Sequence, residues 1–438
     1  LEDGDFYAVW LEKEGLWSTN EDDALYLIDQ ELEKAQKEYI KKYPDSTIVV
    51  NYTWDSSSGS IDDWHKYCQK QKRDSFEILD QKIIFSNEKT VREDFASKKL
   101  NYPLEKGSIE SYDKLISVLY DKENRHKIEW SIGSIVSGDS TKLQKFCVFY
   151  GASGTGKSTI LNIIQDMFEG YCTVFDARVL GQSSASFALE PFKNNPLVAI
   201  QHDGDLSKIE DNTRLNSLTS HELMTVNEKY KSAYASRFKT FLFMGTNKPV
   251  KITDARSGLT RRLIDITPTG NKVPSKEYSR LIKTIPFELG AIAYHCRKVY
   301  LDNPDYYNEY KPLSMMSATN DFFNFMLNSY MVFKDSDGTT LKAAWEMYKT
   351  YCEEANVPFQ MSQRVFKEEL KVYFDDFDDR LRGDGGRLRN YYSGFKIKMF
   401  MDNKKDLDNE EKEDNKYIID FKEQHSIFDD VCKDCLLY

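Results

Sequence analysis

Residues 145–159 read KFCVFYGASGTGKST, and this stretch dictates much of the architecture around it. An apolar run ends at Tyr150, a glycine-rich turn follows, and the chain continues from Ser158 with apolar residues at helical spacing. A strand, such a turn and a helix in this order let consecutive backbone N–H groups surround an anion at the positive end of the helix. We therefore expect a parallel α/β sheet with a phosphate-binding loop at its carboxyl edge.

The residue types in this turn favour a nucleoside triphosphate, ATP or GTP. The Lys157 ammonium is expected at the β- and γ-phosphates, and the Ser158 hydroxyl as a ligand of Mg²⁺. A glycine-rich turn without a ligand is the alternative, and the apolar runs on both sides argue against it. The expected nucleotide-binding residues are Gly151, Ala152, Ser153, Gly154, Thr155, Gly156, Lys157, Ser158 and Thr159.

Composition sets the frame for this loop. The chain has 438 residues, a length that suits two or three domains. Because its net charge is −11, we expect nucleic-acid contacts only through local basic patches. Seven scattered cysteines fit a reducing, cytoplasmic setting (the host cytoplasm for a viral chain), and no run suits a membrane span or a signal peptide. A start at Leu1 suggests part of a longer or processed protein.

Polar residues follow two further apolar runs. Asp203 and Asp205 come after LVAIQH, and Asn247 comes after TFLFMGT. Because ligands gather at the carboxyl edge of a parallel sheet, these side chains are expected beside the loop. One carboxylate, Asp203 in our assignment, would hold Mg²⁺ through water, and the other would orient or deprotonate the attacking water. Asn247 would bind that water and sense the γ-phosphate, with a turn-forming asparagine as the alternative.

Two basic features lie outside this edge. Arg261 and Arg262 directly precede the apolar run LIDI. An arginine can act as an arginine finger, which contacts a phosphate bound to a neighbouring subunit. Residues 221–241 read HELMTVNEKYKSAYASRFKTF, which predicts a hairpin of strand-like MTV and RFKTF with a lysine-rich tip. Its expected single-strand contacts, against the alternative of a solvated hairpin edge, are Lys229, Tyr230, Lys231 and Tyr234.

The region 315–400 predicts two helices, the second beginning near Ser362, followed by a glycine-tipped basic hairpin. This order suggests a winged helix-turn-helix that touches DNA, with an ordinary solvated hairpin as the alternative. The expected DNA contacts there are Arg364, Lys367, Arg387 and Arg389. Residues 401–438 form an acidic tail, and Cys432 and Cys435 in it are more consistent with tail cysteines than with a zinc site.

The five motifs, in this order, resemble those of the superfamily 3 helicases of viruses, phages and plasmids. The matching segments are GASGTGKS, LVAIQHDGD, MTVNEKYKS, FLFMGTNKP and TRRLIDI. The wider layout resembles the helicase part of phage and poxvirus primase-helicases. In that pattern Gly204 is a departure, because it separates two acids that the family often has adjacent, and the roles of Asp203 and Asp205 stay open.

The resemblance implies a hexameric AAA+ ring that hydrolyses ATP with Mg²⁺ between subunits and moves 3′ to 5′ on single-stranded or forked DNA. It implies Lys157 and Ser158 as the nucleotide-binding pair, Asn247 as the sensor, and Arg262 as the finger with Arg261 as alternative. No primase signature is present, so any primase or polymerase activity of the parent protein is expected upstream of Leu1.

The expected fold is α/β, an AAA+ P-loop core with a collar before it and a winged-helix-like domain after it. The alternatives are a small-molecule kinase, a packaging motor, or a DNA-binding initiator switch that separates no strands. The expected regions are a mixed region 1–105, a helical collar 106–140, the motor 141–305, the winged-helix-like domain 315–400 and the tail 401–438.

Overall fold

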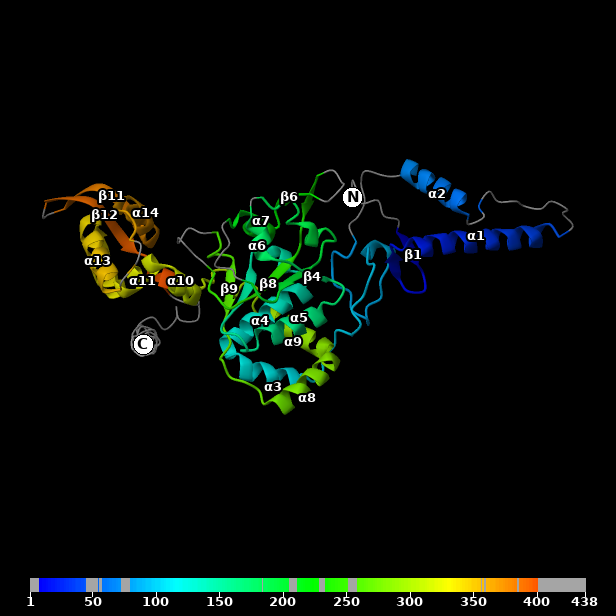
Figure 1. Ribbon diagram of the computed structural model, residues 1–438, viewed down its shortest axis with the longest axis horizontal. Coiled ribbons are helices and arrows are strands. Elements are labelled where there is room, and N and C mark those ends of the chain that lie inside the picture. The colour runs from blue at the N-terminus through cyan, green and yellow to red at the C-terminus, as the bar shows by residue number, and fades with distance from the viewer. Residues whose placement is uncertain are drawn as a thin grey trace. The chain divides into compact units, whose positions relative to one another are not determined.

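The computed structural model describes residues 8–44, 54, 57–71, 79–182, 184–204, 211–227, 233–250, 258–355, 357, 360–383 and 386–400. These residues form two compact units, the first ending at Asp305 and the second beginning at Tyr306. Figure 1 labels those of their helices and strands for which there is room. In the described part of the chain, no helix has both the length and the apolar character needed to cross a membrane.

A five-stranded parallel sheet lies in the core of the first unit (Figure 1), as the sequence predicts. The strand order is β4-β5-β8-β3-β9, so the strand before the glycine-rich loop has a neighbour on each side. Every residue of β5, β8 and β9 is buried, because helices cover a parallel sheet on both faces. The strands are β3 (Phe146–Tyr150), β4 (Cys172–Val174), β5 (Val198–Gln201), β8 (Phe241–Thr246) and β9 (Leu263–Ile266).

Helices pack against this sheet and against one another. α5 contacts β8, α4 contacts β9, and α9 packs along α4. The helices of the first unit are α1 (Glu21–Lys42), α2 (Ser58–Gln71), α3 (Glu110–Leu119), α4 (Lys122–Val136), α5 (Lys157–Met167), α6 (Ala177–Leu180), α7 (Thr213–Thr219), α8 (Ser275–Thr284) and α9 (Leu289–Asp302).

The segment expected as a helical collar consists of two helices, α3 and α4. The chain turns at Tyr120, and the Asp121 side chain accepts a hydrogen bond from the Asn124 N–H at 2.8 Å, which caps α4. α4 is buried from Lys127 to its end, so it belongs to the core of the first unit. The turn leaves Leu119 at the end of α3, where its carbonyl accepts from the Thr269 N–H at 2.9 Å.

Two short antiparallel hairpins complete the first unit. β1 (Val9–Leu11) pairs with β2 (Leu16–Ser18), and β6 (Leu223–Val226) pairs with β7 (Tyr234–Arg237). The second of these confirms the hairpin predicted between the acids and Asn247. Its second strand begins at Tyr234, earlier than the expected RFKTF run, because Tyr234 pairs directly with Val226.

The second unit has helices on an antiparallel sheet of order β10-β12-β11. Two helices followed by a long hairpin appear as expected, with α14 capped by the Ser362 side chain. Its core is aromatic: the buried rings include Phe322, Phe325, Tyr348, Phe366 and Tyr373. The elements are α10 (Leu313–Thr319), α11 (Asp321–Asn328), α12 (Tyr330–Ser336), β10 (Gly338–Thr340), α13 (Leu341–Glu354), α14 (Gln363–Leu370), β11 (Phe374–Gly383) and β12 (Gly386–Phe395).

Candidate functional site

The glycine-rich loop joins β3 to α5 at the carboxyl edge of the sheet. Gly154 and Gly156 have φ values of 77° and 95°, a left-handed conformation that favours glycine. A Cβ on Gly156 would also lie 2.8 Å from Leu119 Cδ1. The loop therefore depends on glycine at residue 156 for its backbone conformation and for its packing against the end of α3.

Lys157 is the first residue of α5, and its side chain folds back onto the loop. Its Nζ donates to Gly151 O at 2.7 Å, Ala152 O at 2.8 Å and Asn247 Oδ1 at 2.8 Å. The residue is only 6% exposed, and burial lowers the pKa of the ammonium while the Asp203 carboxylate acts in the opposite direction. Three neutral oxygens occupy the three donors, so an anion at the loop would provide the charge that this ammonium lacks.

Asn247 connects this lysine to the acid that follows β5. The Asn247 Nδ2 group donates to Asp203 Oδ1 at 3.4 Å, while its Oδ1 accepts from Lys157. Gly245 makes this approach possible, because a Cβ there would lie 2.3 Å from His202 O. The structure thus brings Lys157, Asn247 and Asp203 into one hydrogen-bonded chain, whereas Asp205 lies outside the described residues.

Oxygen groups suited to Mg²⁺ are present at this edge. Ser158 and Asp203 are both exposed, and a hydroxyl and a carboxylate are ligands that this cation prefers. Among the described residues, no group of three or more His, Cys, Asp or Glu side chains could hold a metal ion. A serine hydroxyl and a single carboxylate could hold Mg²⁺ together with phosphate oxygens.

Two other polar residues of the same edge already have partners. Asp176, after β4, accepts from Arg178 Nη2 at 2.8 Å and from Gln201 Nε2 at 3.3 Å, and the Arg178 hydrogen bond lowers its pKa. His202 Nε2 lies 2.8 Å from Gln165 Oε1, and burial lowers the pKa of the imidazole. Asp176 is not among the site residues predicted from the sequence. In the structure, its carboxylate is hydrogen-bonded to Arg178.

Arg261 and Arg262 lie at the opposite, amino edge of the sheet. Phe146 N, at the start of β3, donates to Arg262 O at 2.9 Å, whereas the loop follows the end of β3. At about 3.3 Å per residue, β3 separates the two by roughly 15 Å, more than an arginine side chain spans. Neither arginine can therefore reach the loop of its own chain.

The two arginines differ in their surroundings. Arg262 is 5% exposed and donates to Ser220 Oγ at 2.6 and 3.0 Å and to Gly258 O at 2.8 Å. Burial lowers the pKa of this guanidinium, and Arg261 adds to the effect. No carboxylate among the described residues forms an ion pair with Arg262. Arg261 is exposed.

The expected DNA contacts that the structure describes lie on β7, α14 and β12. Tyr234 opens β7, while Lys229, Tyr230 and Lys231 lie outside the described residues. In the second unit, Arg364 is exposed in the first turn of α14.

Lys367, also on α14, is engaged with the long hairpin of the second unit. Its Nζ donates to Asn390 Oδ1 at 2.9 Å, lies 3.5 Å from Asp379, and stands 4.7 Å from the centre of the Phe377 ring. These contacts tie α14 to β11 and β12.

The same hairpin pairs basic residues with one another. Arg380 lies opposite Arg389, and two residues further along β11, Arg382 lies opposite Arg387. Like charges directly opposite each other are unfavourable in a sheet.

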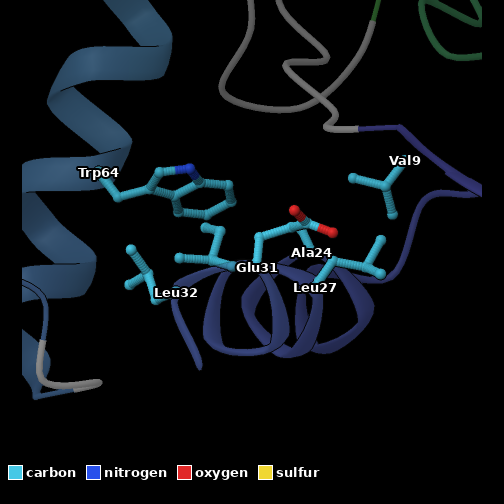
Figure 2. A pocket seen from close by; sticks show the side chains of 7 residues that line it. Val9, Ala24, Leu27, Glu31, Leu32 and Trp64 are labelled. Atoms are coloured by element: carbon cyan, nitrogen blue, oxygen red, sulfur yellow. The ribbon is translucent and has the colours of Figure 1, made fainter. Parts of the chain in front are cut away.

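An apolar pocket of about 390 Å³ lies apart from these residues, between α1 and α2. Figure 2 shows the Trp64 ring over the apolar side chains of α1. Glu31 is the one ionisable residue of its lining, which gives the pocket little chemistry of its own. It is lined by Val9, Ala24, Leu27, Ile28, Glu31, Leu32 and Trp64.

Comparisons with known proteins match the segment that holds the site. The model of a family of unknown function, DUF5906, matches residues 149–262, from the end of β3 to Arg262. No curated protein matches the chain.

Solved structures of the NrS-1 C terminal region are similar to this chain. An A form apo structure has a TM-score of 0.44 at 14% identity, covering 77% of this chain and 91% of that one. Another apo structure, of residues 305–718, has a TM-score of 0.41 at 16% identity, covering 72% and 82%. Both TM-scores are below 0.5.

Proposed function

We propose that this protein is an ATP-dependent DNA helicase of the superfamily 3, AAA+ type, acting as a hexameric ring in phage- or plasmid-type DNA replication. The observation that carries the proposal is the division of polar residues between the two edges of one sheet. Lys157, Asn247 and Asp203 meet at one edge, and two arginines open a strand at the other. A nucleotide held at the first edge would be completed by an arginine of the next subunit.

Different residues of the chain would have different roles in ATP hydrolysis. The loop N–H groups and Lys157 would bind the phosphates of ATP, and Ser158 and Asp203 would hold Mg²⁺, which neutralises charge on the phosphate oxygens. Asn247, which lies between Lys157 and Asp203, would orient a water molecule beside the terminal phosphate. The base that accepts the proton of that water would be Asp205 if Asp203 holds Mg²⁺, and Asp203 if the two carboxylates exchange these roles.

DNA would be held by basic residues of both units. The β6–β7 hairpin would grip single-stranded DNA with Lys229 and Lys231, and Tyr230 or Tyr234 would stack on a base. The α13, α14 and hairpin arrangement of the second unit supports a winged-helix-like role, with Arg364, Arg387 and Arg389 as phosphate contacts. Translocation 3′ to 5′ follows only from the family resemblance.

Strand displacement on a fork with one 3′ tail tests this proposal. We expect Lys157→Ala to lose ATPase and unwinding by about 100-fold or more, as when a preorganised charge at a reacting centre is removed. Lys231→Ala should keep basal ATPase and lose both DNA stimulation and unwinding. Lys142→Ala, an exposed lysine in the same unit, is the matched control and should behave as wild type.

The other outcomes separate the competing functions. Normal unwinding by Lys231→Ala would remove the hairpin from the mechanism. ATP-dependent assembly on DNA without displacement by the wild type would instead indicate an initiator switch or a packaging motor.

A further inference from the structure

The path of a bound nucleotide can be deduced from the strand order. Asn247, after β8, and Asp203, after β5, mark the side of the terminal phosphates together with the Lys157 ammonium that Asn247 contacts. A triphosphate that runs along the loop away from these groups brings its nucleoside to the other flank of β3, where β9 lies.

On that flank, three separate segments close around the loop. A Cβ on Gly151 would lie 3.0 Å from Pro268 Cγ, just after β9, and Leu119 of α3 packs against Gly156. α8 lies against α3 and projects Tyr278 to the start of α5. The Tyr278 hydroxyl is 3.1 Å from Thr159 Oγ1, directly after Ser158.

We propose that Tyr278 is a nucleoside-binding residue whose ring stacks on the base of the bound nucleotide, an inference that rests on the proposed nucleotide-dependent function. The residue is 36% exposed, so part of its surface is available to a ligand. The Thr159 hydroxyl holds the phenol at the loop, which fixes the ring beside the phosphate site before a nucleotide arrives. Stacking on an aromatic ring tolerates any base, so this contact distinguishes a nucleotide from a bare phosphate.

A pair of ligands with the same two phosphates isolates this contact: ADP and inorganic pyrophosphate, each titrated with Mg²⁺ into the full chain by calorimetry. We expect Tyr278→Ala to weaken ADP binding by about 5- to 150-fold and to leave pyrophosphate binding unchanged. Tyr278→Phe keeps the ring and should retain most of the ADP affinity. Tyr294→Ala removes a comparably exposed tyrosine on α9 and should alter neither ligand.

Each other result overturns the assignment. Unchanged ADP binding by Tyr278→Ala means that the ring does not touch the base. An equal loss for ADP and pyrophosphate means that Tyr278 only supports the loop. If Lys157→Ala abolishes ADP binding while Tyr278→Ala has no effect, the loop function stands and this inference alone falls; if the wild type binds neither ligand, both fall.

Discussion

The two edges of the parallel sheet hold their charges in different ways. At the carboxyl edge, the buried ammonium of Lys157 joins Asn247 and an exposed Asp203, beside a loop whose N–H groups can take an anion. At the amino edge, the guanidinium of Arg262 is buried against a serine hydroxyl and a carbonyl. Both edges thus hold a cation that lacks a full anionic partner among the described residues, and β3 keeps them apart.

The separation indicates how the site could be completed. Since neither Arg261 nor Arg262 reaches the loop of its own chain, a contact between either of these arginines and a bound phosphate requires a second copy of the chain. The sequence alone favours Arg262 for that contact, because it directly precedes the apolar strand. Exposure favours Arg261, because Arg262 would first have to leave Ser220 and Gly258.

The largest expected effect comes from removing the arginine that crosses between subunits. An arginine finger contributes about 10³- to 10⁵-fold to turnover, so its loss should nearly abolish ATPase. Arg261→Ala removes the exposed candidate, and Arg262→Gln removes the buried charge while keeping a donor for Ser220. Mixing either variant with inactive Lys157→Ala subunits should restore some ATPase if that arginine acts on a neighbour.

The pattern of rescue separates the two arginines. Rescue of Arg261→Ala together with no rescue of Arg262→Gln would assign the contact to Arg261 and a supporting role to Arg262. If neither variant is rescued at any mixing ratio, the two edges do not meet in a shared site.

A smaller effect separates two carboxylates of the carboxyl edge. Asp203 is exposed and bonded only weakly to Asn247, so it can take Mg²⁺ through water, whereas Asp176 is held by Arg178. Asp203→Asn should lower ATPase by about 10- to 100-fold, the usual cost of disturbing the outer contacts of a metal. Asp176→Asn is the matched control, and steady-state turnover at saturating Mg²⁺ should remain near wild type. Equal losses in both variants would mean that the edge responds as one structural unit.

Much of this edge could be predicted from sequence because its signals are local. The loop, the buried strands and the residues that follow them lie within short windows, and a parallel sheet gathers strand ends at one edge. The break between α3 and α4 was not predicted, since apolar spacing continues across Tyr120 and only the Asp121 cap interrupts it. Contacts between distant segments also escaped prediction, such as Thr159 with Tyr278 and Lys367 with Asn390, because no spacing rule relates them.

The smallest expected effect concerns the stability of the carboxyl edge. The Arg178 hydrogen bond holds the pKa of Asp176 below its ordinary value of 3.8, so the folded state favours the ionised carboxylate. This contribution is fully present above the ordinary pKa and is lost as the pH falls through the lowered pKa of the folded protein.

Because the pair is partly exposed, Asp176→Asn should reduce the free energy of unfolding by less than about 1 kcal/mol at neutral pH. In urea unfolding, the difference from wild type should stay constant from about pH 7 to pH 5 and shrink below about pH 4, whereas Glu105→Gln, an exposed control, should show no difference. A difference that persists in acid would mean that Asp176 stabilises the fold through packing. The ion pair with Arg178 would then no longer be what distinguishes the Asp176 carboxylate from that of Asp203.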